Sequence, residues 1–395
     1  MIRCSVKFLF KLLLVSALFY PFAGHAKELN SSAHFYARQA QDALRKQGGM
    51  PAGVSEDNFF QSALFIEKKL CEYIKRKEYF IEKEKSGLCC ALEYDPQTRK
   101  TFILLPECKE NHIGQGCHKV VKKALLYHRK KPEIVARAYQ EKITKTELHL
   151  SKYLGGCPGL MEVVACTKYA LYTKFYNQNS LHAAVVSHRK FTFSEKVQIA
   201  LGVLTGLKEL HKKGIAHRDI SLKNCLLTHE TEGSSESIFA VLCDFGRAQF
   251  INKSFKKGMR VQGHLPNTPP EGIFYENMQG KDFFKSDLFA AGTILYQLFY
   301  EVGPPWKNSK YMTALLEPAQ SRYEKYVQAI KQHLDCIQTR INNEKQLTTA
   351  VAFELLLLQL CDPDPKKRGT ASEHYRTMKE LYKQVGADLV TCYRR

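Results

Sequence analysis

The chain has 395 residues, of which 44% are hydrophobic, so it is long enough for a large core and for more than one domain. Its formal net charge is +20, from 59 basic and 39 acidic residues. Because Lys and Arg are spread along the chain and form no single block, the charge favours a solvated surface over a nucleic-acid-binding site. We therefore expect no nucleic acid among its partners.

The first 26 residues have the pattern of a secretory signal peptide. Arg3, Lys7 and Lys11 precede an almost wholly apolar run over 12–20, and Gly24 and Ala26 put small residues where a signal peptidase cuts. The run is too short to span a bilayer comfortably as a permanent helix. We expect an exported protein with no stable membrane span after cleavage. The alternative is an N-terminal core helix.

The cysteines fit an exported chain without identifying a metal site. Of 13 cysteines, Cys4 lies in the expected signal peptide, which leaves an even number that could form disulfides. Cys225 and Cys243 lie on apolar, strand-like runs and are expected to be buried thiols. No Cys-x-x-Cys pair is present to suggest zinc.

Residues 27–110 form an N-terminal extension that is expected to be helical and then a β-hairpin. Apolar residues recur at helical spacing over 55–85, and two β-like runs, 89–94 and 101–105, flank a turn. The extension carries no functional motif. It either packs against the rest of the fold or binds a partner, and the pattern favours packing.

From residue 113 the pattern alternates between glycine-containing turns, strands and helices. Gly114 and Gly116 start a β-like run, a strand is expected over 133–139, and a strong helical pattern covers 193–212. That helix leads directly into the loop 217–224, which reads HRDISLKN.

The chemistry expected here follows from three oxygen-bearing side chains, two on this loop and one further along the chain. Asp219 and Asn224, five residues apart, can present a base and a metal ligand to one small space, and Asp244, after a strand, can complete a magnesium site. Phosphoryl transfer from ATP needs such a set.

These motifs resemble the catalytic and metal-binding loops of the eukaryotic-type protein kinase family. The resemblance rests on His217-Arg218-Asp219 with Asn224, on Asp244-Phe245-Gly246, and downstream on Pro269-Pro270-Glu271, Asp287 and Arg368. It implies an α+β, two-lobed fold, with a small β-rich lobe and a large helical lobe over 111–385 and a C-terminal tail over 386–395. Asp287 would anchor the catalytic loop, and Arg368 would pair with Glu271.

The resemblance also implies roles in the transfer step. Asp219 would orient the acceptor hydroxyl or take its proton, Asn224 and Asp244 would hold Mg²⁺, and Lys223 would place an ammonium group on the phosphate. Most Ser/Thr kinases carry Lys two residues after the Asp, where this chain has Ser221. Tyrosine kinases carry Arg at the place of Lys223, so the choice between Ser/Thr and Tyr stays open.

The implied ATP site is less complete than the catalytic loop. Its expected residues are Ile113, Gly114, Gly116, Val121, Arg137, Glu147, Thr173 and Phe175. Lys119 stands at the third glycine of the family's loop, and Arg137 (or Ala138, in a shifted register) stands where the family has Lys. His264 replaces the customary Thr of the activation segment, in which Ser254 and Thr268 are candidate phosphorylation sites.

We therefore expect an exported protein kinase that transfers the γ-phosphate of ATP to protein hydroxyls. The alternative is a pseudokinase, a kinase-fold binding or scaffold module that has lost ATP handling. An exported kinase must reach a place that contains ATP, such as another cell or a secretory-pathway lumen.

Overall fold

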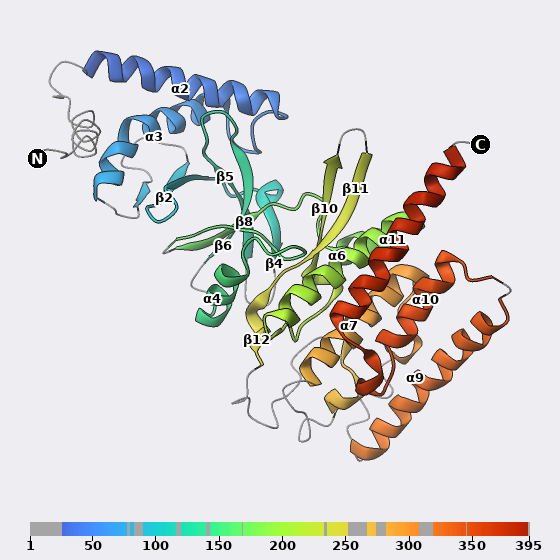
Figure 1. Cartoon of the computed structure of the whole chain (residues 1–395). Helices are drawn as coiled ribbons and strands as arrows, with labels where there is room; N and C mark the ends of the chain where they lie inside the picture. Colours follow the sequence, from blue (N-terminus) through green and yellow to red (C-terminus); the bar gives the residue numbers. More distant parts are fainter. Residues whose placement is uncertain are drawn as a thin grey trace, which may run out of the picture. The chain divides into compact units, whose positions relative to one another are not determined.

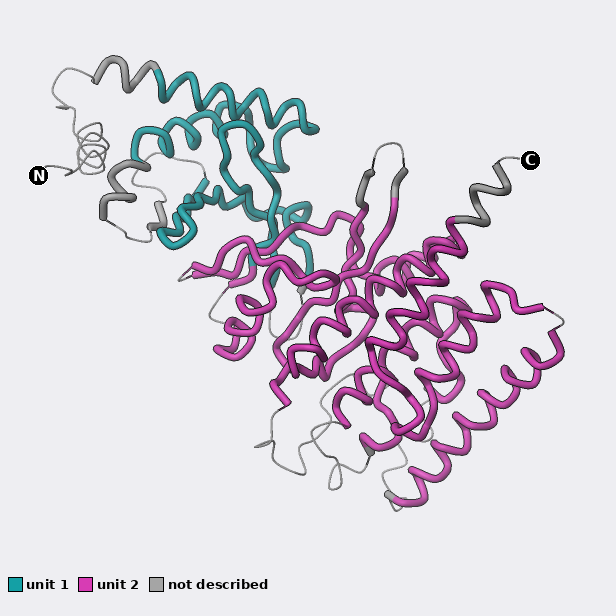
Figure 2. Tube along the Cα trace, viewed as in Figure 1, with its two compact units in different colours: residues 1–137 teal, residues 138–395 magenta. Residues whose placement is uncertain are grey.

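A computed structural model describes residues 26–76, 80–82, 90–115, 120–139, 143–167, 169–232, 235–251, 267–273, 282–307, 319–344 and 346–393. The chain divides into two compact units, residues 1–137 and 138–395 (Figure 2). Apart from Ala26, the expected signal peptide lies outside the described residues. Among the described residues, no helix has the length and apolarity needed to cross a membrane.

The first unit is a β-sheet with two helices packed on it (Figure 1). Its strand order is β1-β2-β3-β5-β6, and β4 also pairs with β5. In chain order the elements are α2 (Ala26–Lys46), α3 (Glu56–Arg76), β1 (Phe80–Glu82), β2 (Ala91–Asp95), β3 (Lys100–Leu104), η1 (Lys109–Asn111), β4 (His112–Gln115), β5 (Val120–Leu126) and β6 (Glu133–Tyr139).

The expected helix of the extension is α3, which is shorter than the predicted range 55–85. The Ser55 hydroxyl accepts a hydrogen bond from the Asn58 backbone N–H at 3.1 Å and so caps its first turn. Phe59, Ala63 and Ile66 form its buried face. The residues before it form a second long helix, α2, whose buried residues pack with those of α3, β2, β3 and β5.

The expected hairpin is formed by β2 and β3. The Asp95 carboxylate accepts hydrogen bonds from the backbone N–H of Gln97 at 3.1 Å and of Thr98 at 3.3 Å, which closes the turn. Because β3 also pairs with β5, with Ile103 opposite Leu125, the extension continues the sheet of the predicted kinase strands. The extension therefore packs on the strands that follow it within the first unit.

The second unit is mainly helical, with short strand pairs. In chain order its elements are α4 (Lys145–Leu154), β7 (Val163–Cys166), β8 (Ala170–Lys174), α5 (Leu181–Val186), α6 (Phe193–Lys212), β9 (Ile215–Ala216), η3 (Leu222–Asn224), β10 (Cys225–Glu232), β11 (Ser235–Leu242), η4 (Phe245–Arg247), β12 (Gln249–Phe250), η6 (Pro270–Ile273), α7 (Asp282–Tyr300), η8 (Pro305–Lys307), α9 (Ala319–Asn342), α10 (Thr349–Leu360), η9 (Pro365–Arg368) and α11 (Ala371–Tyr393). The expected tail over 386–395 continues α11 as far as Tyr393.

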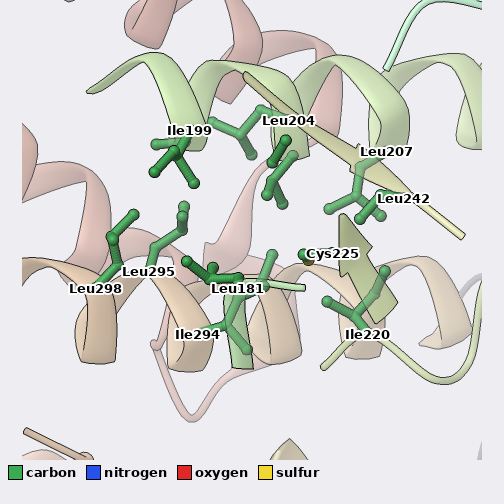
Figure 3. Close-up of a cluster of buried hydrophobic side chains, with 14 of the residues drawn as sticks. Leu181, Ile199, Leu204, Leu207, Ile220, Cys225, Leu242, Ile294, Leu295 and Leu298 are labelled. Carbon is green, nitrogen blue, oxygen red and sulfur yellow. The ribbon is translucent and has the colours of Figure 1, made fainter. Parts of the chain in front are cut away.

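The core of this unit is built on α6. Apolar side chains from α6, β10, β11 and α7 converge there, among them Leu204, Leu242 and Ile294 (Figure 3). Two helical glycines let the chain approach closely: a Cβ on Gly202 would lie 2.3 Å from the Ala240 carbonyl oxygen, and one on Gly206 would lie 2.4 Å from that of Gly159. This packing fixes the start of the loop that follows α6.

Candidate active site

The loop over 217–224 is held by a carboxylate from α7. Asp287 accepts hydrogen bonds from the backbone N–H groups of His217 and Arg218, each at 2.8 Å, and its Oδ2 lies 3.1 Å from His211 Nε2. Arg218 has a left-handed backbone, with φ of 66°, which such bonds help to hold. The expected anchoring role of Asp287 is confirmed.

Asp219 and Asn224 lie together, as their spacing predicted. The Asn224 side-chain Nδ2 donates a hydrogen bond to the Asp219 carbonyl oxygen at 2.8 Å. The Asp219 side chain is only 13% exposed, and its Oδ1 lies 3.8 Å from Nη1 of Arg247. Lys223, on η3 between them, is exposed. The loop therefore presents a carboxylate, an amide and an ammonium group.

Asp244 stands at the start of η4 with a left-handed backbone, φ 65° and ψ 76°. Its Oδ1 accepts a hydrogen bond from the Gly246 N–H at 3.3 Å. Phe245 is fully buried and packs edge-on against His217, whose Nε2 lies 3.1 Å from the Cys243 carbonyl oxygen. These contacts hold the segment that carries Asp244 against the catalytic loop.

Glu147 lies beside this segment. It is buried on α4, and a Cβ on Gly246 would come within 3.3 Å of its Oε2. The α4 helix starts at Thr144, whose hydroxyl accepts a hydrogen bond from the Glu147 N–H at 3.1 Å. A side chain at 246 would therefore crowd the Glu147 carboxylate, which would have to shift by a few tenths of an ångström.

Asn224 and Asp244 are suitable magnesium ligands. Asn224 uses its Nδ2 on the Asp219 carbonyl, which leaves its Oδ1 as the oxygen that can bind a metal. Mg²⁺ is usually held by one or two protein oxygens together with phosphates and waters, so this pair fits. Within the described ranges, no cluster of three or more His, Cys, Asp or Glu side chains is arranged for a metal.

The first unit contains the strands expected to carry the phosphate loop. Ile113 and Gly114 lie on β4, and Gly114 pairs with Val121 of β5. Gly116 and Lys119 lie outside the described residues, as do Ser254 and His264. The structure therefore places the two strands, and the tip that should touch phosphate stays a prediction.

Arg137 is on β6, as predicted, and its side chain is buried. Its Nη2 lies 3.3 Å from Oε2 of Glu93, a carboxylate on β2 with no exposed surface. Nothing in the sequence pattern points to Glu93, because a glutamate between Leu92 and Tyr94 in a strand looks like an ordinary solvent-facing residue. The extension thus supplies a partner to the residue expected to hold the phosphates.

The residues expected at the adenine pocket lie on or just after β8. Thr173 is buried and pairs with Val163 of β7, and Phe175 is half-buried. The segment is tied to β7 by Glu162, whose carbonyl accepts from Lys174 N–H at 3.0 Å and whose N–H donates to the Tyr176 hydroxyl at 3.0 Å.

Downstream, Glu271 and Arg368 form the expected buried ion pair. Arg368 is fully buried, its Nη2 lies 2.8 Å from Glu271 Oε2, and its Nε donates to the Asp362 carbonyl at 2.6 Å. Thr268 is also buried, 6% exposed, and this does not favour phosphorylation there. Its neighbour Asn267 donates from Nδ2 to the Ile220 carbonyl at 3.0 Å, which ties this segment to the catalytic loop.

Comparison with known proteins agrees with this geometry. The protein kinase domain family model matches residues 108–378. Dual specificity testis-specific protein kinase 1 of Mus musculus is 25% identical over 237 residues, which are 60% of this chain and 33% of the relative. Dual specificity testis-specific protein kinase 2 of Mus musculus is 25% identical over 239 residues, 60% of this chain and 36% of the relative.

A receptor is also among the similar proteins. The high affinity nerve growth factor receptor of Gallus gallus is 22% identical over 269 residues, 64% of this chain and 31% of the relative. The chain thus spans about a third of the length of these curated relatives. With the family match over most of the chain, and the catalytic loop, the Asp244 segment and the Glu271–Arg368 pair in place, this chain belongs to the protein kinase family.

Proposed function

We propose that this chain is an active, exported protein kinase that transfers the γ-phosphate of ATP to protein hydroxyls. The observation that carries the proposal is the 2.8 Å hydrogen bond from Asn224 Nδ2 to the main-chain carbonyl of Asp219, which holds the expected metal ligand next to the residue whose carboxylate would orient the acceptor. Asp219, Asn224 and Asp244 are the residues that such transfer requires, and all are present. They are also residues that an inactive relative is free to lose.

The transfer follows from the arrangement. The acceptor hydroxyl gives its proton to Asp219 while its oxygen forms a bond to the γ-phosphorus. The bond from that phosphorus to the bridging oxygen breaks, and its electron pair leaves with ADP. Asn224 and Asp244 would hold Mg²⁺, which neutralises charge on the phosphates.

We further propose that both aliphatic and phenolic hydroxyls are accepted. Two of the relatives are named dual-specificity kinases. In this chain a small hydroxyl residue, Ser221, is buried two residues after Asp219, and a cation, Lys223, is exposed four residues after it. Neither the usual Ser/Thr marker nor the usual Tyr marker is therefore present. Phosphoamino-acid analysis of labelled substrates distinguishes the classes, and a single labelled hydroxyl type would contradict dual specificity.

The test of activity uses the chain from Lys27 onward with labelled ATP and Mg²⁺. We expect label on the protein itself or on a generic protein substrate, and its loss in Asp219→Ala. Asp335→Ala, at an exposed position on α9, is the matched control and should keep full activity. No transfer and no magnesium-dependent nucleotide binding by the wild type would rule out an enzyme.

A kinase-fold binding module is the second candidate. The observation that favours it is the buried Arg137–Glu93 pair, since an arginine engaged with a carboxylate has less charge to offer a phosphate. This second candidate predicts a protein that folds but shows no magnesium-dependent turnover of ATP.

Export is a separate proposal, which rests on the signal-peptide pattern over 1–26. N-terminal sequencing of the protein recovered outside the producing cytoplasm should begin at Lys27. A product that begins at Met1 and stays in that cytoplasm would contradict export while leaving the kinase proposal standing.

A further inference from the structure

Arg247 has no role in the kinase motifs of this chain, and its backbone is fixed beside the catalytic loop. It ends η4, directly after Gly246, and the next residue bonds back to Phe245, from Ala248 N–H to the carbonyl at 3.1 Å. The following strand β12 pairs with β9, so that Gln249 is opposite Ala216. Arg218 Nη1 donates to Gln249 Oε1 at 2.7 Å. The backbone of Arg247 is therefore held by contacts of the residues before it and after it in the chain.

The Arg247 side chain lies over the acceptor-orienting carboxylate. Its Nη1 is 3.8 Å from Asp219 Oδ1, which is too long for a hydrogen bond and within the range of an ion pair. The arginine side chain is 43% exposed, whereas the Asp219 side chain is 13% exposed. A guanidinium has five N–H donors, so this exposure leaves donors for an incoming anion.

The transfer step gives this cation a role. The family's phosphate-binding lysine has no clear counterpart in the sequence, and the catalytic loop itself offers an ammonium group, Lys223. A phosphoryl group moving to a hydroxyl held by Asp219 must pass within a few ångströms of that carboxylate, and its charge is spread over three equatorial oxygens. A planar guanidinium matches such oxygens better than an ammonium group does.

Resting on the proposed kinase activity, we propose that Arg247 is a catalytic cation: when ATP and acceptor bind, it contacts the oxygens of the transferring phosphoryl group beside Asp219. In the structure the guanidinium lies 3.8 Å from the Asp219 carboxylate. In the transition state it stabilises the charge that develops on phosphate. Its contribution is therefore to kcat more than to the binding of ATP.

The test compares Arg247→Ala and Arg247→Lys with the wild type under saturating ATP and Mg²⁺. We expect kcat to fall by about 10²-fold in Arg247→Ala, the usual effect of removing one charge-stabilising donor, with the KM for ATP changed by less than about threefold. Arg247→Lys should recover part of kcat. Guanidinium ion added well below denaturing concentration should partly restore Arg247→Ala, which a purely structural role would not produce.

Arg376→Ala, an exposed arginine on α11, is the matched control and should leave kcat unchanged and unresponsive to guanidinium. The thermal midpoint of each variant checks folding. An active wild type with unchanged kcat in Arg247→Ala overturns this inference and leaves the kinase proposal standing. If Arg247→Ala changes only the KM for acidic peptides, the inference is likewise overturned and the kinase proposal stands, because Arg247 would then select substrates. An inactive wild type overturns both proposals.

Discussion

Arg137 and Glu93 form a buried ion pair, with 3.3 Å between Nη2 and Oε2, that joins a strand of the N-terminal extension to the strand expected to carry the phosphate-binding cation. Removing one partner of such a pair leaves an unpaired buried charge, whereas replacing both with apolar residues is often nearly neutral for stability. This difference allows a structural role and a nucleotide-binding role to be measured separately.

The first prediction concerns this pair. Arg137→Met alone should destabilise the protein by about 3–5 kcal/mol, and the double variant Arg137→Met with Glu93→Met should recover most of that loss. If Arg137 holds the phosphates, the double variant should fold well and still show a sharply raised KM for ATP. Urea unfolding and ATP titration report the two effects. A normal KM in the double variant would move the phosphate-binding role to another residue, such as Lys122.

The second prediction concerns the anchor of the catalytic loop. Asp287→Asn replaces one of the two carboxylate oxygens that accept from the N–H groups of His217 and Arg218 with an NH2 group. One buried N–H then faces a donor and loses its acceptor. We expect a loss of about 1–3 kcal/mol in stability together with a fall in kcat. Chemical unfolding and steady-state kinetics measure the two quantities. Unchanged kcat would show that the loop keeps its shape without this carboxylate.

The third prediction compares a buried ion pair with an exposed one. Arg368→Met removes a fully buried partner from Glu271, whose own side chain is only 14% exposed, and should cost about 3–5 kcal/mol. Lys383→Ala removes a pair with Glu380 in which both side chains are mostly exposed, and its effect on unfolding should fall within experimental error. Equal effects of the two substitutions would contradict the structural role given to Arg368.

The fourth prediction is a pH dependence. Burial lowers the pKa of His374 below its ordinary value, although a hydrogen bond to the Arg368 carbonyl opposes the shift. As the pH falls below about 6.5, the unfolded chain takes up a proton that the folded histidine resists, so stability is lost with falling pH. Urea unfolding between pH 7.5 and about 5.5 should therefore show a steeper loss for the wild type than for His374→Asn. Equal slopes of unfolding free energy against pH in the two proteins would contradict the role given to His374.

The large lobe was predictable because its signals are local. The helix over 193–212 appears with the expected bounds, since apolar residues at helical spacing follow a Thr192–Glu195 capping box. The helix α9, 24 residues long, carries no family motif, so the resemblance gives no expectation for it. The second helix of the extension, α2, is stabilised by packing against α3.

By itself, the sequence determined the family, the order of the strands and helices that carry the motifs, and the residues Asp219, Asn224 and Asp244, because fixed spacing on short loops places these side chains together. Only the tertiary structure decided what surrounds them. Glu93 is 44 residues from Arg137, and Arg247, about 28 residues after Asp219, lies 3.8 Å from its carboxylate. Such contacts depend on how distant segments pack and on which charges are buried, and neither can be predicted from residue spacing along the chain.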